Sequence, residues 1–373
     1  MKITEIDVTR HIVPCDPPYP AAWDSIPRAT LPVTILRVRT NTGLEGFASG
    51  DPCYGIEDYR THFIGQDPRE MDRHTAVIEN IGAHHSRMWP LDLALWDLNG
   101  KIEGQPVWRL LGGTSPEVPL YASTGSLRSA EVLGGMARAY RAQGYQALKL
   151  RFGRSSEDSD LRVLAAVREA VGDDMAIMVD LNHGWRMPWD THPVPSLDEI
   201  MALEERTREF DLFWLEEPLH RGDYVGMRAL REHARCRIAG GEVTRELHEF
   251  AQILRDDCLD VYQPDVVFVG GMKHLIDLGL QVFEKDLWFT PHTWGNGLGV
   301  IVNAHLVAAV AGRRGQKPVW LEFAHDPPEF TETPRDVLLA EPLTPRDGVL
   351  ELSDQSGWGV ALNEKALAET RVA

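Results

Sequence analysis

Cysteine is scarce in this sequence of 373 residues, and low-complexity segments are absent from it. The four cysteines lie far apart in the chain, at Cys15, Cys53, Cys236 and Cys258. Because no two of them have the spacing of zinc ligands or of a disulfide framework, we expect a reducing, cytoplasmic location. Hydrophobic residues make up 43% and charged residues 25% of the sequence, which argues against a disordered or fibrous chain and indicates a globular one.

Positive charge is in deficit, and no apolar run is long enough for a transmembrane helix. The 38 Lys and Arg residues face 56 Asp and Glu residues, a formal charge of −18, and such a field repels nucleic acid and anionic membranes. The longest apolar run, residues 298–312, contains Asn303 and His305, and residues 1–10 lack the apolar core of a signal peptide. We expect no export, no membrane span and no nucleic-acid partner. An anionic substrate would need a metal or local cations.

After residue 115, short β-branched runs alternate with segments of helical periodicity, which is typical of successive βα units and a parallel sheet. Eight strands favour a closed α/β barrel, for which roughly 250 residues is typical. An open doubly wound sheet is the alternative, although no glycine-rich dinucleotide fingerprint follows the first strand. The predicted strands lie at 119–123, 146–152, 176–182, 212–217, 237–243, 260–266, 287–292 and 319–323. Helices are predicted between them, for example at 131–142, 161–171, 197–208, 247–255 and 272–284.

The first 115 residues have a different pattern and predict a separate α+β domain. A long connection, residues 15–30, carries Tyr19, Trp23 and Arg28 and is rich in proline. We interpret it as a lid or binding loop, with surface packing as the alternative. The barrel domain is assigned to residues 116–329, and residues 330–373 are expected to pack back on the first domain. Strands are predicted at 3–13, 32–40 and 44–48 with a turn at 41–43, and helices at 71–81 and 91–102.

Three acidic residues stand at the ends of consecutive barrel strands: Asp180 in MVDLN, Glu216 in WLEEP and Glu242 in AGGEV. The carboxyl ends of barrel strands converge on the mouth of the barrel. Like charges held close together repel unless a cation lies between them, and oxygen ligands favour Mg²⁺, or Mn²⁺, over zinc. One such acid could be a solvated strand end or a helix cap, but three in register predict a metal site.

Basic residues and a histidine stand at the ends of the other strands. Lys149 and Arg151 in ALKLRFG point to the same side of their strand. Two cations on the inner face of a barrel are costly unless an anion meets them, with salt bridges at the rim as the alternative. His292 in TPHTWGNG and Asp265 in QPD end neighbouring strands, and a carboxylate bound to a histidine ring is the arrangement expected of a general base. Glu322 in WLEFA ends the last strand.

These motifs together resemble the enolase superfamily and, within it, the mandelate racemase subgroup, the mandelate racemase/muconate lactonizing enzyme family. LDLALWDLNGK, GQPVWRLLGG, ALKLRFG, VDLN, LEEP, GGE, QPDVVFVGGM and PHTWGN follow in the family's order over nearly the whole chain. The resemblance implies a capping domain over a modified (β/α)7β TIM barrel, with Asp180, Glu216 and Glu242 as Mg²⁺ ligands and Asp265 and His292 as a catalytic dyad. It also implies a small-molecule carboxylate substrate, whose enediolate Mg²⁺ stabilises, and homo-oligomers from dimers to octamers.

One position departs from the family's pattern. The family carries Lys-x-Lys on the second strand, with the second lysine as a base, and this sequence has Arg151 there. A guanidinium stays protonated, so we expect Arg151 to clamp a carboxylate or to stabilise charge, and His292 to be the strong base. Racemisation needs a base on both faces, whereas β-elimination can use one. The sequence therefore predicts a lyase, a dehydratase of an acid sugar such as an aldonate or aldarate.

Two other reactions use the same chemistry and stay open at this point. A racemase or epimerase would use Lys149 as its second base, and a lactone cycloisomerase would act on a ring. A non-catalytic binding protein of the same fold would lack magnesium binding. Substrate specificity is expected to depend on the loop and the strand ends, with Arg28, Tyr19, Asn182 and Trp294 as predicted contacts.

Overall fold

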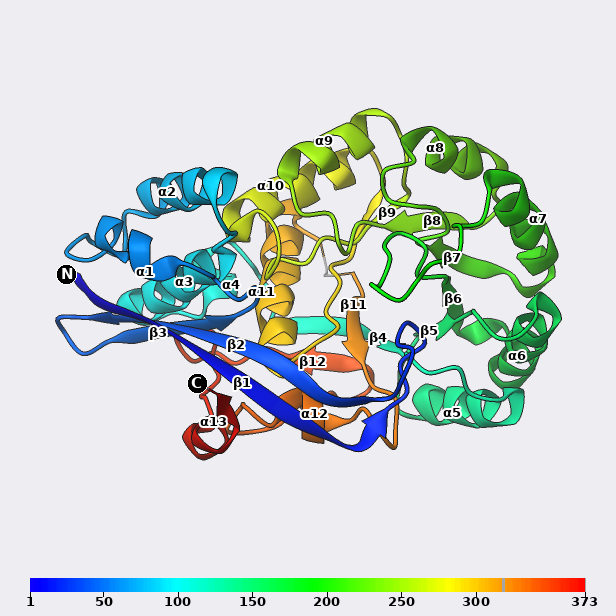
Figure 1. Cartoon of the computed structure of the whole chain (residues 1–373), viewed down its shortest axis with the longest axis horizontal. Coiled ribbons are helices and arrows are strands. Elements are labelled where there is room, and N and C mark those ends of the chain that lie inside the picture. The colour runs from blue at the N-terminus through cyan, green and yellow to red at the C-terminus, as the bar shows by residue number, and fades with distance from the viewer. Residues whose placement is uncertain (317–318, 373) are drawn as a thin grey trace.

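The computed structural model describes residues 1–316 and 319–372 of the chain. Within these residues, an antiparallel sheet with its helices stands beside a curled parallel sheet that has helices on its outer surface (Figure 1). This arrangement confirms the predicted fold class, a barrel of βα units with an α+β cap. No helix in the described part of the chain is both long and apolar enough to cross a membrane.

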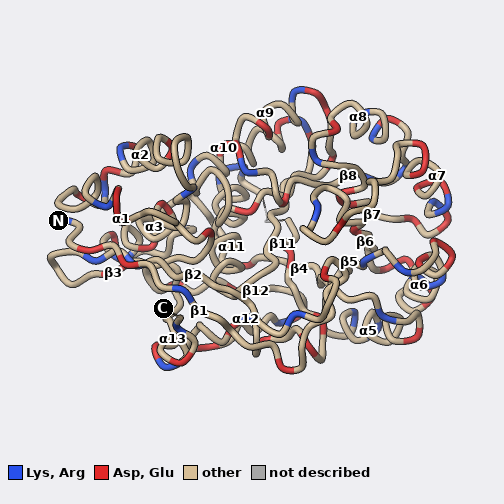
Figure 2. Tube along the Cα trace, in the orientation of Figure 1, with Lys and Arg blue, Asp and Glu red and all other residues tan. Residues whose placement is uncertain are grey.

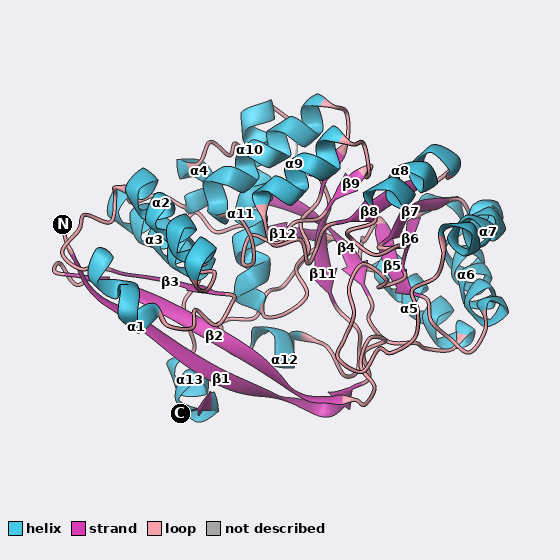
Figure 3. Ribbon diagram, turned by 45° about the horizontal axis from the view of Figure 1, so that its top comes forward, coloured by secondary structure: helices cyan, strands magenta, loops and turns pink. Residues whose placement is uncertain are grey.

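The antiparallel sheet is built mainly from the start of the chain, in the strand order β13-β1-β2-β3. β1 and β2 form a long ribbon that runs below the helices of the cap and reaches toward the barrel (Figure 3). The predicted bounds of the loop at residues 15–30 are wrong, because both strands continue into it and leave residues 20–27 as the connection. β13 covers β1 only at Arg10 and His11, so most of β1 is an edge where prolines without an N–H are tolerated. The strands are β1 (Ile3–Tyr19), β2 (Arg28–Thr40), β3 (Glu45–Ser49) and β13 (Arg371–Val372).

Helices of the cap pack on one side of this sheet. The two helices that the periodicity predicted are present as α2 (Met71–His84) and α3 (Trp89–Glu103). α3 lies very close to β3, since a Cβ added at Gly46 would be 2.1 Å from the carbonyl oxygen of Ala94. Glycine at this position therefore lets the helix and the strand touch through their backbones. The short elements of the cap are α1 (Ile56–Tyr59), η1 (Arg60–His62) and α4 (Val107–Leu110).

The parallel sheet has the order β10-β9-β8-β7-β6-β5-β4-β11. β9 and β10 are shorter than predicted because Pro264 and Pro291 follow them, and proline has no N–H for a ladder bond. The strands are β4 (Glu117–Ser123), β5 (Ala147–Arg151), β6 (Ala176–Asp180), β7 (Leu212–Glu216), β8 (Arg237–Gly240), β9 (Val261–Tyr262), β10 (Trp288–Phe289) and β11 (Leu321–Ala324). The helices between them are α5 (Ala130–Ala142), α6 (Glu157–Val171), α7 (Leu197–Thr207), α8 (Tyr224–His233), α9 (Leu247–Arg255), α10 (Gly271–Glu284) and α11 (Gly297–Arg314). Two turns of 3-10 helix, η2 (Gly172–Asp174) and η3 (Arg208–Phe210), follow α6 and α7.

Side chains close the gap between the first and last strands of this sheet. No backbone ladder joins β10 to β11 within residues 1–316 and 319–372. Instead, the hydroxyl of Thr290 donates to the carbonyl of Trp320, and that of Thr293 donates to the carbonyl of Glu322 at 2.6 Å. Both threonines follow β10, so these bonds tie the segment after β10 to the start of β11 and, one layer higher, to Glu322.

Alternation along the strands puts an apolar plug below a polar mouth. The inward side chains of the lower layer form one buried cluster, which includes Ala147, Met178 and Trp214. Two residues further along each strand, the same face carries Lys149, Asp180 and Glu216. Because side chains alternate across a strand, an apolar residue at one position places the next inward residue one layer higher. The polar residues at the mouth therefore lie directly above a buried, close-packed apolar layer.

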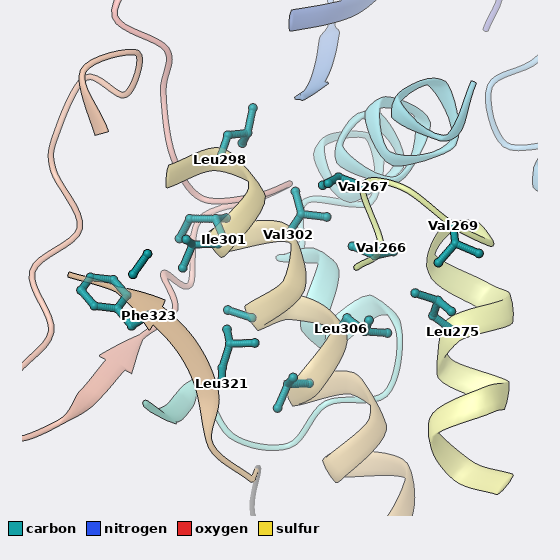
Figure 4. Close-up of a cluster of buried hydrophobic side chains, with 14 of the residues drawn as sticks. Val266, Val267, Val269, Leu275, Leu298, Ile301, Val302, Leu306, Leu321 and Phe323 are labelled. Atoms are coloured by element: carbon teal, nitrogen blue, oxygen red, sulfur yellow. The ribbon is translucent and has the colours of Figure 1, made fainter. Parts of the chain in front are cut away.

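The last part of the barrel and the C-terminal segment complete the fold. Figure 4 shows Leu298, Ile301, Val302 and Leu306 of α11 packed near Leu321 and Phe323 of β11, all of them buried. Residues after β11 form α12 (Glu332–Asp336), β12 (Val349–Glu351) and α13 (Glu364–Thr370). β12 pairs with β4 of the barrel, and β13 pairs with β1 of the cap. Charged residues of both signs are spread over the outer helices (Figure 2).

Candidate active site

Three carboxylates meet at the mouth of the barrel. Asp180 ends β6, Glu216 ends β7, and Glu242 lies two residues beyond β8. One oxygen of each lies within 4.8 Å of the others, and all three residues are buried. The structure thus brings together the three acids that the strand ends predicted as metal ligands.

Each of these carboxylates has one oxygen fixed by an N–H donor. The backbone N–H of Asn182 donates to Asp180 Oδ1 at 2.8 Å. Trp214 Nε1 donates to Glu216 Oε2 at 2.9 Å, and Trp185 Nε1 donates to Glu242 Oε1 at 2.7 Å. The other oxygens face positively charged or titratable nitrogens. Donors of this kind hold metal-binding carboxylates in one orientation.

Two buried cations neutralise part of this charge. Lys149 Nζ lies 2.6 Å from Glu216 Oε1, 2.7 Å from Glu322 Oε1 and 3.5 Å from Asp180 Oδ2. The Arg151 guanidinium donates to Asp180, and its Nε donates to the carbonyl of Thr124 at 2.9 Å. Lys149 is fully buried and Arg151 nearly so. Burial alone would favour the neutral form of such groups, so these ion pairs keep both charged.

The site has more negative than positive charge. Six buried acids lie in it, against Lys149, Arg151 and the histidine His292: Asp180, Glu216, Glu217, Glu242, Asp265 and Glu322. Burial and the neighbouring carboxylates raise the pKa of Glu216 to about 8 in spite of Lys149, and burial also raises the pKa of Glu242. Glu217 Oε2 is buried without a hydrogen-bond partner in the described residues. Because the acids share one enclosed space, their negative charges repel one another, and a further cation among them would be stabilising.

A divalent cation suits the type and the spacing of these acidic ligands. The three acids in contact offer oxygen ligands, which suit Mg²⁺ better than zinc or copper. One carboxylate oxygen of each acid lies within 4.8 Å of an oxygen of the other two, close enough to share one ion. The residues present therefore could hold a metal ion.

His292 lies at the edge of the acid cluster. Its Nδ1 is 3.1 Å from Asp265 Oδ2, and its Nε2 is 3.7 Å from Glu242 Oε2. The other oxygen of Asp265 accepts from Asn303 Nδ2 at 2.8 Å. Burial lowers the pKa of His292, but Glu242 and Asp265 outweigh burial and raise it to about 9. With Nδ1–H held by Asp265, Nε2 is the ring nitrogen left to exchange a proton.

A cavity of about 410 Å³ opens above these groups. Arg151, Asn182, Glu242 and His292 line its floor. The other predicted substrate contacts, Tyr19, Arg28 and Trp294, line its walls. Its volume lies within the usual range for a small-molecule site, roughly 300–1,000 Å³.

Five predicted site residues do not line the cavity: Asp180, Glu216, Asp265, Lys149 and Glu322. Lys149 and Glu322 are fully buried behind its lining. Glu322 accepts from Ser123 Oγ at 2.8 Å and from the N–H of Thr293 at 3.0 Å, besides its contact with Lys149. Burial raises the pKa of Glu322, but Lys149, with His292 and Arg151, outweighs burial and holds it low, at about 2. Lys149 and Glu322 therefore act on the cavity through other groups.

Several lining residues escaped the sequence analysis. Trp185 and Met187 come from the connection after β6, Phe268 from the one after β9, and Phe330 from the C-terminal segment. Trp185 follows Asn182 closely at a strand end, and that position was the available signal. Phe330 carries no such signal, because only folding brings it to the cavity. Arg245, another of them, follows Glu242 by three positions.

Comparisons with known proteins find relatives over both parts of the chain. Residues 3–112 match the model of the mandelate racemase / muconate lactonizing enzyme N-terminal domain, and residues 132–366 match the enolase C-terminal domain-like model. The chain is 31% identical to the D-galactarolactone cycloisomerase of Agrobacterium fabrum, over 85% of this chain and 84% of that one. It is 28% identical to the L-talarate/galactarate dehydratase of Salmonella typhimurium, over 93% and 84%. A crystal structure of that dehydratase with Mg and L-lyxarohydroxamate superposes with a TM-score of 0.83 at 25% identity, over 100% and 93% of the two chains.

Proposed function

The chain belongs to the mandelate racemase/muconate lactonizing enzyme family of the enolase superfamily, and from this premise we propose that it removes the proton α to a substrate carboxylate and eliminates water from an acid sugar. The observation that carries the proposal is the position of His292. Its Nε2 points into the site beside Glu242, while Asp265 holds its Nδ1. A base placed in this way next to a metal site is what α-proton removal requires.

Mg²⁺ is the cofactor that we propose, with Mn²⁺ as the alternative metal. Asp180, Glu216 and Glu242 would hold it, since their oxygens converge and their charge is undercompensated. When bound, such an ion polarises a substrate carboxylate and makes the α-proton more acidic. The related dehydratase of Salmonella typhimurium has been crystallised with Mg, which supports this choice.

Arg151 takes the place of a second base. It lines the cavity, and its guanidinium stays protonated because Asp180 raises its pKa further. Arg151 therefore binds the carboxylate end of the substrate and offsets negative charge there, but cannot remove a proton. Asn182 accepts a hydrogen bond from it at 3.2 Å and helps to orient it.

Lys149 is poorly placed to act as the base on the opposite face. Its Nζ is fully buried and lies within 2.7 Å of both Glu216 and Glu322. An ammonium held by two carboxylates has a raised pKa and gives up its proton reluctantly. This arrangement disfavours racemisation and favours a reaction that needs a single base.

β-Elimination needs one base only. The neutral form of His292 takes the α-proton on Nε2, the C–H electron pair forms the new double bond, and the β-hydroxyl leaves with its own electron pair. The protonated His292 then returns the proton to the departing oxygen, which becomes water. Atoms and charge balance, and the product is the enol form of a 2-keto acid. Cycloisomerisation is the second candidate function, and it would use the same steps with a ring oxygen as the leaving group. The 31% identity to a D-galactarolactone cycloisomerase favours this candidate.

A deuterium-exchange screen tests the proposal. The protein is incubated in D₂O with aldonates and aldarates, with Mg²⁺ and then with EDTA, and α-proton exchange and water loss are followed by NMR and mass spectrometry. We expect α-proton exchange with Mg²⁺ and none with EDTA, and we expect the His292→Asn variant to lose the exchange. His183→Asn is the matched control, since His183 also follows a strand at the mouth but does not line the cavity. Retained turnover in His292→Asn would refute the assignment of the base.

A further inference from the structure

The protein binds two of the three guanidinium nitrogens of Arg151. Nε donates to the carbonyl of Thr124 at 2.9 Å, and Nη1 donates to Asp180 and, at 3.2 Å, to Asn182. In the described part of the chain the third nitrogen, Nη2, has no hydrogen-bond partner, although Arg151 lines the cavity. Nη2 is therefore the donor that remains for the carboxylate of a substrate.

Trp23, in the connection between β1 and β2, packs on this guanidinium. Arg151 Cζ lies over the Trp23 ring, 5.0 Å from its centroid, within the range of about 6 Å over which an indole face attracts a cation. The Trp294 ring is further away, at 5.8 Å, and its Nε1 donates to Ser123. A planar guanidinium stacks on an aromatic face, whereas a lysine ammonium is a point charge. Trp23 thus suits the arginine that replaces the family's lysine at this position.

The backbone around Trp23 is fixed by residues outside the cavity lining. The carbonyl of Trp23 accepts from Trp189 Nε1 at 3.1 Å. Trp189 belongs to the connection between β6 and α7 and does not line the cavity. The N–H of Ala22 donates to the carbonyl of Gly125, which follows β4, at 2.7 Å. The connections after β1, β4 and β6 therefore meet at Trp23 and together fix its position.

We propose that Trp23 is a positioning residue for the reaction, and that it acts through Arg151 with Trp189 as its support. The indole holds the guanidinium in the orientation in which Nη2 donates to the substrate carboxylate. A guanidinium without this ring keeps its charge but loses part of its orientation, so it binds the carboxylate less tightly. The inference rests on the proposed function, because it takes carboxylate binding by Arg151 as given and adds the residues that orient Arg151.

A double-mutant cycle tests whether Trp23 acts through Arg151. The kcat/KM for α-proton exchange is measured in D₂O with Mg²⁺, using the acid that the wild type exchanges fastest. The four proteins are the wild type, Trp23→Leu, Arg151→Met and the double variant. We expect Trp23→Leu to lower kcat/KM about tenfold in the wild-type background, the loss that removal of a partly desolvated cation–π contact gives. In the Arg151→Met background the same change should have almost no effect, because the group that it orients is missing.

Three single variants separate this role from a general effect on structure. Trp23→Phe retains an aromatic face and should recover most of the kcat/KM that Trp23→Leu loses. Trp189→Phe removes the N–H that donates to Trp23, so it should lower kcat/KM several-fold in the wild type and have no further effect in Trp23→Leu. Trp96→Phe is the matched control and should leave kcat/KM unchanged. Trp96 lies on α3, does not line the cavity, and its Nε1 has no hydrogen-bond partner in the described residues.

Additive losses in the double variant would show that Trp23 acts on the substrate by itself, and would overturn the inference. A Trp23→Phe protein no more active than Trp23→Leu would overturn it as well. If Arg151→Met does not fold, the cycle of Trp189→Phe with Trp23→Leu and the recovery in Trp23→Phe decide the question. Absence of exchange in the wild type with every acid of the screen would instead refute the proposed function.

Discussion

Removal of one carboxylate from the acid cluster should separate metal binding from folding stability. In Glu242→Gln the side-chain oxygen that accepts from Trp185 Nε1 is retained, and the charge is lost. Burial raises the pKa of Glu242, so its charged form is disfavoured in the folded protein when no cation is bound. We therefore expect Glu242→Gln to be at least as stable as the wild type in EDTA. Addition of Mg²⁺ should not raise the Tm of this variant.

The size of the wild-type response follows from linkage. At a free Mg²⁺ concentration of 100 times Kd, binding to the folded state adds about 2.7 kcal/mol. For a chain of 373 residues the entropy of unfolding is about 0.8 kcal/mol per kelvin. The wild-type Tm should therefore rise by about 3 °C on addition of Mg²⁺, a shift that differential scanning calorimetry resolves.

A matched Glu→Gln variant serves as the control for this experiment. Glu204 is buried on α7, pairs with Arg208 at 2.7 Å and accepts from the N–H of Arg235 at 2.8 Å. Glu204→Gln should lower Tm both with and without Mg²⁺, and should show the full shift on addition of the metal. A wild-type Tm that ignores Mg²⁺, or a Glu242→Gln protein that keeps the shift, would refute the metal site.

Three other perturbations test separate parts of the structure. Asp265→Asn removes the charge that lies 3.1 Å from His292 Nδ1, so kcat for proton exchange should fall by roughly 10²–10⁴ while the Mg²⁺ shift in Tm stays; an unchanged kcat would contradict the dyad. Burial lowers the pKa of His305 from 6.5 to about 3, so the folded state resists its protonation and stability is lost as pH falls below 6.5. Relative to His305→Gln, the wild type should lose about 2 kcal/mol in urea unfolding between pH 7.5 and pH 5, and parallel curves would argue against a neutral buried ring. Asp326→Asn weakens the bond that holds Tyr19 at 3.2 Å, so KM should rise several-fold with a smaller change in kcat, and the reverse pattern would contradict a positioning role.

The strand ends were predictable because local pattern fixes them. Asp180 and Glu216 end their strands as predicted, and the helices α2, α5 and α9 begin within one residue of their predicted starts. Period-2 and period-3.6 patterns indicate which residues of a strand or helix face the core. These patterns are local, so they can be recognised without knowing how the elements pack together. The loop at residues 15–30 was too long in the prediction because prolines suggested a break, whereas pairing with the neighbouring strand carried β1 through them.

The sequence alone determined which chemical groups stand at the mouth of the barrel, since an apolar residue facing inward, as at Met178, puts the next inward side chain, Asp180, one layer higher. Only the tertiary structure decided which of these groups reach the cavity. It buries Lys149 among carboxylates and leaves Arg151 in the lining, and it brings Tyr19 within bonding distance of Asp326, 307 positions away. Contacts between such distant segments depend on how whole elements pack, and local periodicity carries no record of that packing.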